Sequence, residues 1–160
     1  DNHGTHGVSI SLLNIPSSYE FTPPKEEYGL SLSLIQFGKI RNKGVDISLI
    51  NSDKCWYCTS DSYGLTISLL HLLKGELING LSIGILNNYR YLRNSGQIGI
   101  LNLSEKTKEK VYQIGVINLM RANNETKYFQ IGLINYNPIA EGAKLRFFFS
   151  RSKQSEEVKQ

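Results

Sequence analysis

The chain repeats one short pattern of apolar and polar positions eight times. Its clearest copies read Gln-Ile-Gly-Val-Ile-Asn at 113–118 and Gln-Ile-Gly-Leu-Ile-Asn at 130–135. Apolar residues alternate with polar or small ones in each copy, and this period of two is typical of a β-strand. A repeated unit of this kind indicates an all-β protein built by stacking the copies on one another. The central apolar residues of the copies are Ile10, Leu32, Ile47, Ile67, Ile83, Ile98, Ile114 and Ile131.

The spacing of the copies predicts one repeat domain. Successive central residues are separated by 15 to 22 residues, and the two longest gaps carry Pro16, Pro23 and Pro24 or the segment from Cys55 to Cys58. Insertions at such places map to loops on the outside of a stack. We therefore expect a single domain over 1–150 and a polar C-terminal tail over 151–160.

Two architectures fit the pattern. In a parallel β-solenoid of about eight repeats of 15–22 residues, equivalent positions stack at about 4.8 Å, so the Ile column forms a core ladder and the Asn column an amide ladder. In an eight-stranded antiparallel meander, closed as an outer-membrane-type barrel, the apolar side would face lipid. The constant register favours the solenoid, because antiparallel neighbours would place Asn at alternate ends of the sheet. The predicted Asn ladder comprises Asn14, Asn51, Asn87, Asn102, Asn118 and Asn135.

Small residues and chain ends add local expectations. The Gly or Ser between the two central apolar positions suggests close approach of another backbone. A Gly just before most copies marks a turn into the strand. The segment 72–78 could form at most one helical turn, because it contains Gly75. The segment from Leu145 to Phe149 is expected to be a divergent ninth strand that caps the stack, since terminal repeats are atypical.

The copies at 97–102, 113–118 and 130–138 resemble the QIGLIN phrase of the surface repeat-containing proteins of Leptospira. The resemblance covers residues 8–138 and is closest in the C-terminal half, since Ser replaces Gly in the earlier copies. It implies an exported bacterial protein of the cell surface or outer membrane with no known enzymatic role. The family supplies no catalytic residues, and the chain has no lipobox cysteine at its start.

The net charge of the chain says little about the class of partner that it binds. The net charge is +4 and the pI is about 9.0, which permits contact with anionic surfaces but does not indicate nucleic acid. In a solenoid the basic connectors would lie along one edge, where they could bind an anionic glycan. Glutamates interleaved among them weaken that field. The predicted anion-binding stripe comprises Lys43, Arg90, Arg93, Lys106, Lys108, Lys110, Arg121 and Lys127.

Candidate chemistry is sparse. Cys55 and Cys58 have the CxxC spacing of a redox pair or half a zinc site, but no second CxxC follows and the three histidines are not at finger spacing. A structural disulfide or two plain thiols is the favoured interpretation. His71 occupies the Asn position of its copy and is expected to be a member of the polar ladder.

These observations predict a non-enzymatic bacterial cell-surface or envelope repeat protein without a cofactor. We expect it to be a scaffold for contact with a host or envelope ligand, and its solenoid ends, Phe147 to Phe149 above all, favour self-association. A small outer-membrane barrel with a structural or pore role and a CxxC redox or metal protein are the alternatives.

Overall fold

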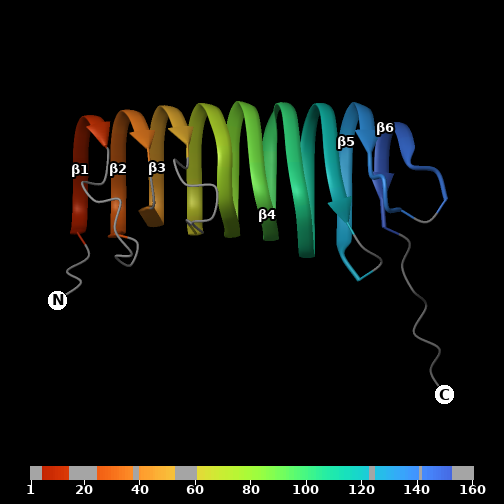
Figure 1. Cartoon of the computed structure of the whole chain (residues 1–160), viewed down its shortest axis with the longest axis horizontal. Helices are drawn as coiled ribbons and strands as arrows, with labels where there is room; N and C mark the ends of the chain where they lie inside the picture. The colour runs from red at the N-terminus through yellow and green to blue at the C-terminus, as the bar shows by residue number, and fades with distance from the viewer. Residues whose placement is uncertain are drawn as a thin grey trace, which may run out of the picture.

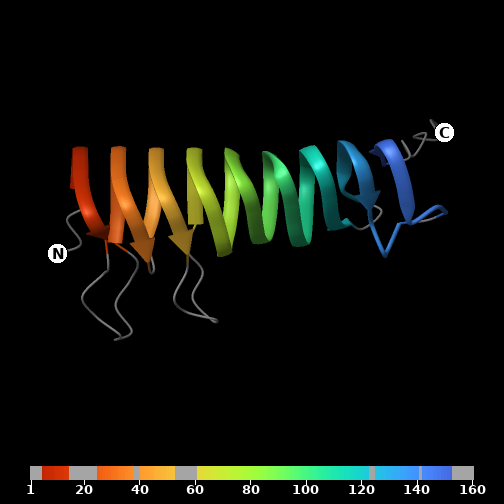
Figure 2. The same cartoon turned by 90° about the horizontal axis from the view of Figure 1, so that it is seen from above.

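The chain forms a coil whose stacked turns consist of β-strand, as the computed structural model shows for residues 5–14, 25–37, 40–52, 61–122, 125–140 and 142–152. Successive turns follow one another along the long axis, from β1 at one end to β6 at the other (Figures 1 and 2). Every regular element in these ranges is a strand. The strands are β1 (Thr5–Asn14), β2 (Lys25–Phe37), β3 (Ile40–Ser52), β4 (Asp61–Ala122), β5 (Lys127–Tyr136) and β6 (Leu145–Arg151).

The pairing from β1 to β5 is parallel throughout, in the order of the sequence. Equivalent motif positions lie side by side, so that Leu32 is paired with Ile10 on one side and Ile47 on the other. The predicted parallel β-solenoid is therefore confirmed, and the antiparallel alternative is wrong. β4 passes through four copies of the pattern without a break, which gives six strand elements instead of eight separate repeats.

The connectors within β4 are strand as well. The expected helical turn at 72–78 is wrong, because this stretch is part of β4. Stacked turns can satisfy the backbone N–H and C=O groups of a connector through the neighbouring turns, so an extended connector leaves few of these groups unpaired.

The interior of the motif wall is polar, which corrects the prediction of an Ile core. The Ile and Leu columns of the motif point outward, whereas Gln97 and Asn102 are buried, with 1% and 0% of their surface exposed. Ile98, Ile100 and Asn102 are two positions apart along the chain, so strict alternation would place all three on the same side. The alternation breaks at the end of each copy, and Ile98 and Ile100 therefore face out whereas Asn102 faces in. The half-buried Leu101 lies at this bend of the coil.

The buried Asn column forms a continuous amide ladder in β4 and β5. Asn87 Nδ2 donates to Asn102 Oδ1 at 2.8 Å, Asn102 donates in the same way to Asn118, and Asn118 donates to Asn135, each at 2.8 Å. Each of the first three amides also donates to a backbone carbonyl of the next turn, for example Asn102 Nδ2 to Ile114 O at 3.0 Å. A buried amide is tolerated where its donors and acceptor find partners.

The ladder continues toward the N-terminus with other residue types. His71 takes the next place, with its Nδ1 at 2.8 Å from Asn87 Oδ1, as the sequence predicted. Asn51 Nδ2 donates to Gln36 Oε1 at 3.2 Å and to Asp46 Oδ2 at 2.6 Å. The side chain of Asn14 lies outside the described residues.

A second ladder of glutamines runs beside the first in the opposite sense. Gln130 Nε2 donates to Gln113 Oε1 at 2.8 Å, and Gln113 Nε2 donates to Gln97 Oε1 at 2.6 Å. The Asn amides therefore donate toward the C-terminal end and the Gln amides toward the N-terminal end. The two ladders couple each turn to the next by side-chain bonds in addition to the backbone bonds.

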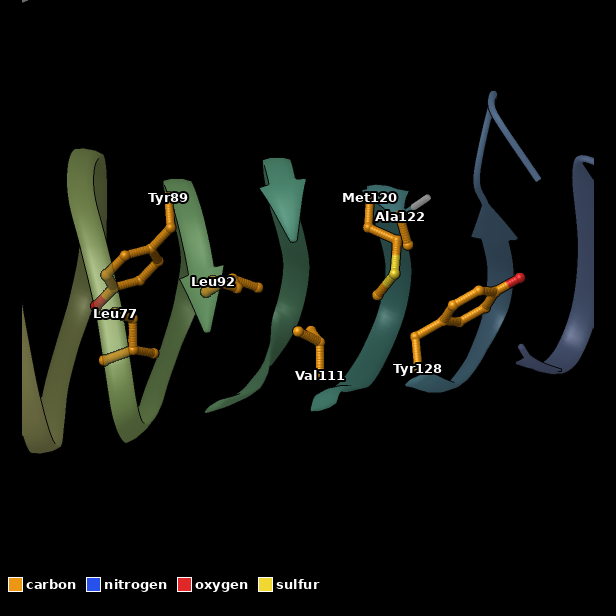
Figure 3. Packing of buried hydrophobic residues seen from close by; sticks show 7 residues of the cluster. All are labelled: Leu77, Tyr89, Leu92, Val111, Met120, Ala122 and Tyr128. Carbon is orange, nitrogen blue, oxygen red and sulfur yellow. The ribbon is translucent and has the colours of Figure 1, made fainter. Parts of the chain in front are cut away.

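The apolar core lies against the other wall of the coil (Figure 3). It is built by residues outside the repeated motif, in the stretches between its copies. Leu92 and Met120 are each 1% exposed, and Tyr89 is completely buried while its hydroxyl hydrogen-bonds Ser82 at 3.2 Å. The cluster comprises Leu77, Tyr89, Leu92, Val111, Met120, Ala122 and Tyr128.

Two glycine columns fit different needs. Gly44 has φ of 149° and stacks on Gly29 and Gly64, at the corner that precedes the motif, in line with the predicted turn. In the motif itself, a Cβ on Gly115 would collide with the carbonyl oxygen of Gly99 and lie 2.6 Å from Asn102 Nδ2. This is the close backbone approach that the sequence predicted.

The C-terminal end carries the divergent ninth strand. β6 pairs antiparallel with β5, with Ile131 opposite Phe149 and a register shift between Gly132 and Asn135. The change of direction ends the parallel stacking at this side. The predicted C-terminal strand is confirmed, although residues 153–160 of the expected tail lie outside the described residues.

Candidate interaction surface

The outer side of the motif wall carries two parallel columns of aliphatic side chains, which we name the aliphatic face. The columns arise because positions two residues apart in a strand point to the same side, and because the parallel register stacks the copies. The first column comprises Ile10, Leu32, Ile47, Ile67, Ile83, Ile98, Ile114 and Ile131. The second comprises Leu12, Leu34, Leu49, Leu69, Ile85, Ile100, Val116 and Leu133.

These side chains are accessible although they are large and apolar. In the second column Ile100 is 54% exposed, Ile85 is 47% exposed and Leu133 is 57% exposed. The first column is less accessible, since Ile98 is 37% exposed and Leu32, Ile67 and Ile83 are half-buried. Both columns consist of Ile, Leu and Val alone, over all eight copies. Single exposed apolar residues are ordinary on a protein surface, but a contiguous patch of this size marks a binding surface.

A shallow groove runs between the two columns. It is lined by Ile83 and Ile98 on one side and by Ile85 and Ile100 on the other. Its floor is the backbone of the small residues between them, among which are Ser68, Gly84, Gly99 and Gly115. Because the side chains of that column point inward or are absent, the floor is smooth along the stack.

The aliphatic face continues onto β6. Phe149 pairs with Ile131 of the first column, and Phe147 lies two residues along the same strand. Both phenylalanines are exposed, by 61% and 60%. The face therefore reaches from β1 to the C-terminal end of the coil and ends there in aromatic side chains.

The residues of the predicted basic stripe lie on the outer surface, outside the aliphatic face. Lys110 and Lys127 occupy paired positions in neighbouring turns. Lys43 and Lys106 instead contact tyrosines of the preceding turn, Tyr28 and Tyr91, through their hydroxyl groups at 3.0 and 3.3 Å. The stripe is exposed at Lys106, Lys108, Lys110, Arg121 and Lys127 and half-buried at Lys43, Arg90 and Arg93, with exposed Glu105, Glu109 and Glu125 among them. Anion binding by this stripe stays a prediction.

A small hollow lies beside the positive-φ glycines at the N-terminal end. His6 stacks on Tyr28 with a centroid distance of 4.6 Å, and Lys43 Nζ lies 4.8 Å from the same ring centroid. The hollow is lined by these side chains together with Gly29 and Gly44. Its aromatic and cationic lining contributes a polar corner next to the aliphatic face.

The predicted cysteine chemistry lies outside the description, because Cys55 and Cys58 fall within 53–60. Among the residues that the structure does describe, no three His, Cys, Asp or Glu side chains gather as a metal site. No helix long and apolar enough to cross a bilayer occurs in those same ranges.

Sequence reasoning assigned the aliphatic columns to the core and so missed the surface they form. The signal was present, because the Gln and Asn positions recur as regularly as the Ile positions. A recurrent amide is suited to a buried ladder, and a buried ladder on one side of a strand leaves the apolar side facing out.

Comparison with known proteins adds no relative. No family model matches the chain, and no curated protein or solved structure is significantly similar to it.

Proposed function

We propose that this chain is a non-enzymatic interaction scaffold of a bacterial cell surface or envelope, and that it contacts its partner through the aliphatic face. The observation that carries the proposal is the pair of uncharged, accessible aliphatic columns on a continuous coil. Contiguous apolar patches rimmed by polar residues are where soluble proteins bind other molecules. The cellular location rests on the resemblance of the QIGLIN copies to Leptospira surface repeat proteins.

The arrangement of bonds supports a rigid scaffold. Backbone pairs link each turn to the next, and from Asn87 to Asn135 the buried Asn and Gln ladders add side-chain bonds between turns. β-Branched side chains, which dominate the first column, have few rotamers to lose on binding. A surface that is already ordered loses little conformational entropy when it meets a partner, which favours affinity.

The first experiment measures whether the folded face binds an apolar probe. The uncharged dye Nile red is titrated at a protein concentration where light scattering gives the monomer mass. We expect saturable fluorescence enhancement that falls at least about threefold in Ile100→Lys, since the charge interrupts the second column. Ile139→Lys is the matched control, because Ile139 is similarly exposed, by 46%, but lies in the segment between β5 and β6.

The far-UV circular dichroism spectrum of both variants should match that of the unmodified chain. Exposed positions tolerate such changes within about 0.5 kcal/mol of stability. Equal dye binding by the unmodified chain and Ile100→Lys would refute the assignment of the face as the binding surface. The location is tested separately by protease added to intact cells that express the chain and to cells whose outer membrane has been permeabilised. Digestion on intact cells places the chain at the surface, digestion only after permeabilisation places it inside the envelope, and protection in both would contradict the proposed location.

A further inference from the structure

We infer that the occupant of the aliphatic face is the same face of a second copy of this chain, so that two solenoids pack face to face. This inference rests on the proposed function and names the partner for it. Three properties of the face favour a second copy, namely its spacing, its area and its composition.

The spacing of the face matches itself. All rows of side chains follow the strand spacing of about 4.8 Å, because the pairing is parallel and in register. A two-fold axis between two such faces sets every row of one copy against the rows of the other over the whole length. Closed two-fold dimers use one patch on both subunits in this way. A partner of another structure would have to reproduce this spacing.

The area of the face lies at the lower limit for a specific interface. Eight rows at about 4.8 Å and a width of about four residues at 3.3 Å give about 40 by 13 Å, or about 500 Å² on each copy. The pair would then cover about 1,000 Å², which is the size at which specific interfaces begin. Phe147 and Phe149 of β6 extend the face by a further row, and Tyr112 and Phe129 add exposed apolar surface beside the first column.

The composition favours a protein face over a lipid surface. Sheets stack through interdigitated aliphatic side chains at about 10 Å, and both columns are made of Ile, Leu and Val. Membrane-interface surfaces characteristically carry rows of Trp and Tyr anchors, whereas neither column contains one and Tyr112 is a single tyrosine beside the first column. The groove along the smooth floor at Gly84, Gly99 and Gly115 leaves room for the side chains of the opposite column.

The test is the oligomeric state of the full chain over a concentration series, by sedimentation equilibrium and small-angle X-ray scattering. We expect a dimer whose length equals that of the monomer and whose cross-section is about twice as thick in one direction, because the second coil packs with its motif wall about 10 Å from that of the first. Ile85→Lys, near the middle of the face, should weaken dimerisation at least about 30-fold, as expected for a charge placed in an interface centre. Ile139→Lys should leave it unchanged.

A third variant separates face packing from pairing at the ends. Phe148 is 69% exposed on the terminal strand β6, where its backbone partner is Gly132 and not a residue of either column. Phe148→Lys should leave a face-to-face dimer intact. A dimer of doubled length, or one lost in Phe148→Lys and kept in Ile85→Lys, would overturn the inference in favour of the ends.

Two further outcomes would overturn the face-to-face dimer and leave the proposed function of the aliphatic face standing. In the first outcome, the chain stays monomeric at all concentrations and floats with phosphatidylcholine–phosphatidylglycerol vesicles, whereas the Ile85→Lys variant does not float. The occupant of the aliphatic face is then a lipid surface. A monomer that ignores vesicles but still binds the dye through Ile100 keeps the proposed interaction face and loses the second copy. Loss of dye binding and dimerisation together would remove both proposals.

Discussion

Replacing Asn102 by Ala tests the buried amide ladder at an interior position. The Asn102 side chain is completely buried and takes part in three hydrogen bonds: it accepts one from Asn87 and donates to Asn118 Oδ1 and to Ile114 O. In the variant, Asn118 Oδ1 loses its donor inside the coil, whereas Asn87 Nδ2 keeps its bond to Ile98 O at 3.0 Å.

The expected loss of stability follows from this count. A buried acceptor left without its donor costs about 1–3 kcal/mol, and the lost bonds to the remaining groups contribute about 1 kcal/mol. We therefore expect Asn102→Ala to lower the free energy of unfolding by about 2–4 kcal/mol. Asn135→Ala should cost about half as much, because Asn135 accepts from Asn118 and otherwise donates only within its own turn, to Gly132 O at 3.0 Å.

The measurement is urea denaturation followed by far-UV circular dichroism. Asn88→Ala is the matched control, since Asn88 adjoins the ladder residue Asn87 but is half-buried, and it should change stability by less than about 0.5 kcal/mol. The double variant of Asn102 and Asn118 should lose less than the sum of the single losses by about 1 kcal/mol or more, because the two amides share a bond. Equal stability of Asn102→Ala and Asn88→Ala would refute the stabilising role of the ladder.

Two other predictions follow from the interior glycines and the basic surface. Gly115→Ala should destabilise the fold by about 1–3 kcal/mol in the same assay, because the new methyl group collides with Gly99 O. Gly96→Ala is the control, because the atom nearest to its new methyl group is a leucine methyl carbon at 3.1 Å. Equal losses of stability in the two variants would contradict the close backbone approach at Gly115. The double variant Lys110→Glu, Lys127→Glu should leave heparin–agarose at lower salt than the unmodified chain if the stripe binds anionic glycans, and unchanged elution would count against such binding.

Much of the architecture was predictable from the sequence alone. The constant spacing of the motif copies indicated stacked parallel turns, and the recurrence of Asn at one place indicated an amide ladder, which is present from Asn87 to Asn135. The divergence of the last strand indicated the C-terminal end of the stack. These features follow from period and register, which a linear sequence displays directly.

The direction of each face was decided only by the tertiary structure. Alternation along a strand says that two faces differ, and hydropathy then favours placing Ile98 inside and Gln97 outside. Stacking reverses this choice, because Gln97 and Asn102 find amide partners in the neighbouring turns and thus tolerate burial. The apolar core came from residues such as Leu92 and Met120 on the opposite wall, which the motif does not include. The aliphatic face, and with it the candidate binding surface, therefore exists because side-chain hydrogen bonds between turns form only once the chain has coiled.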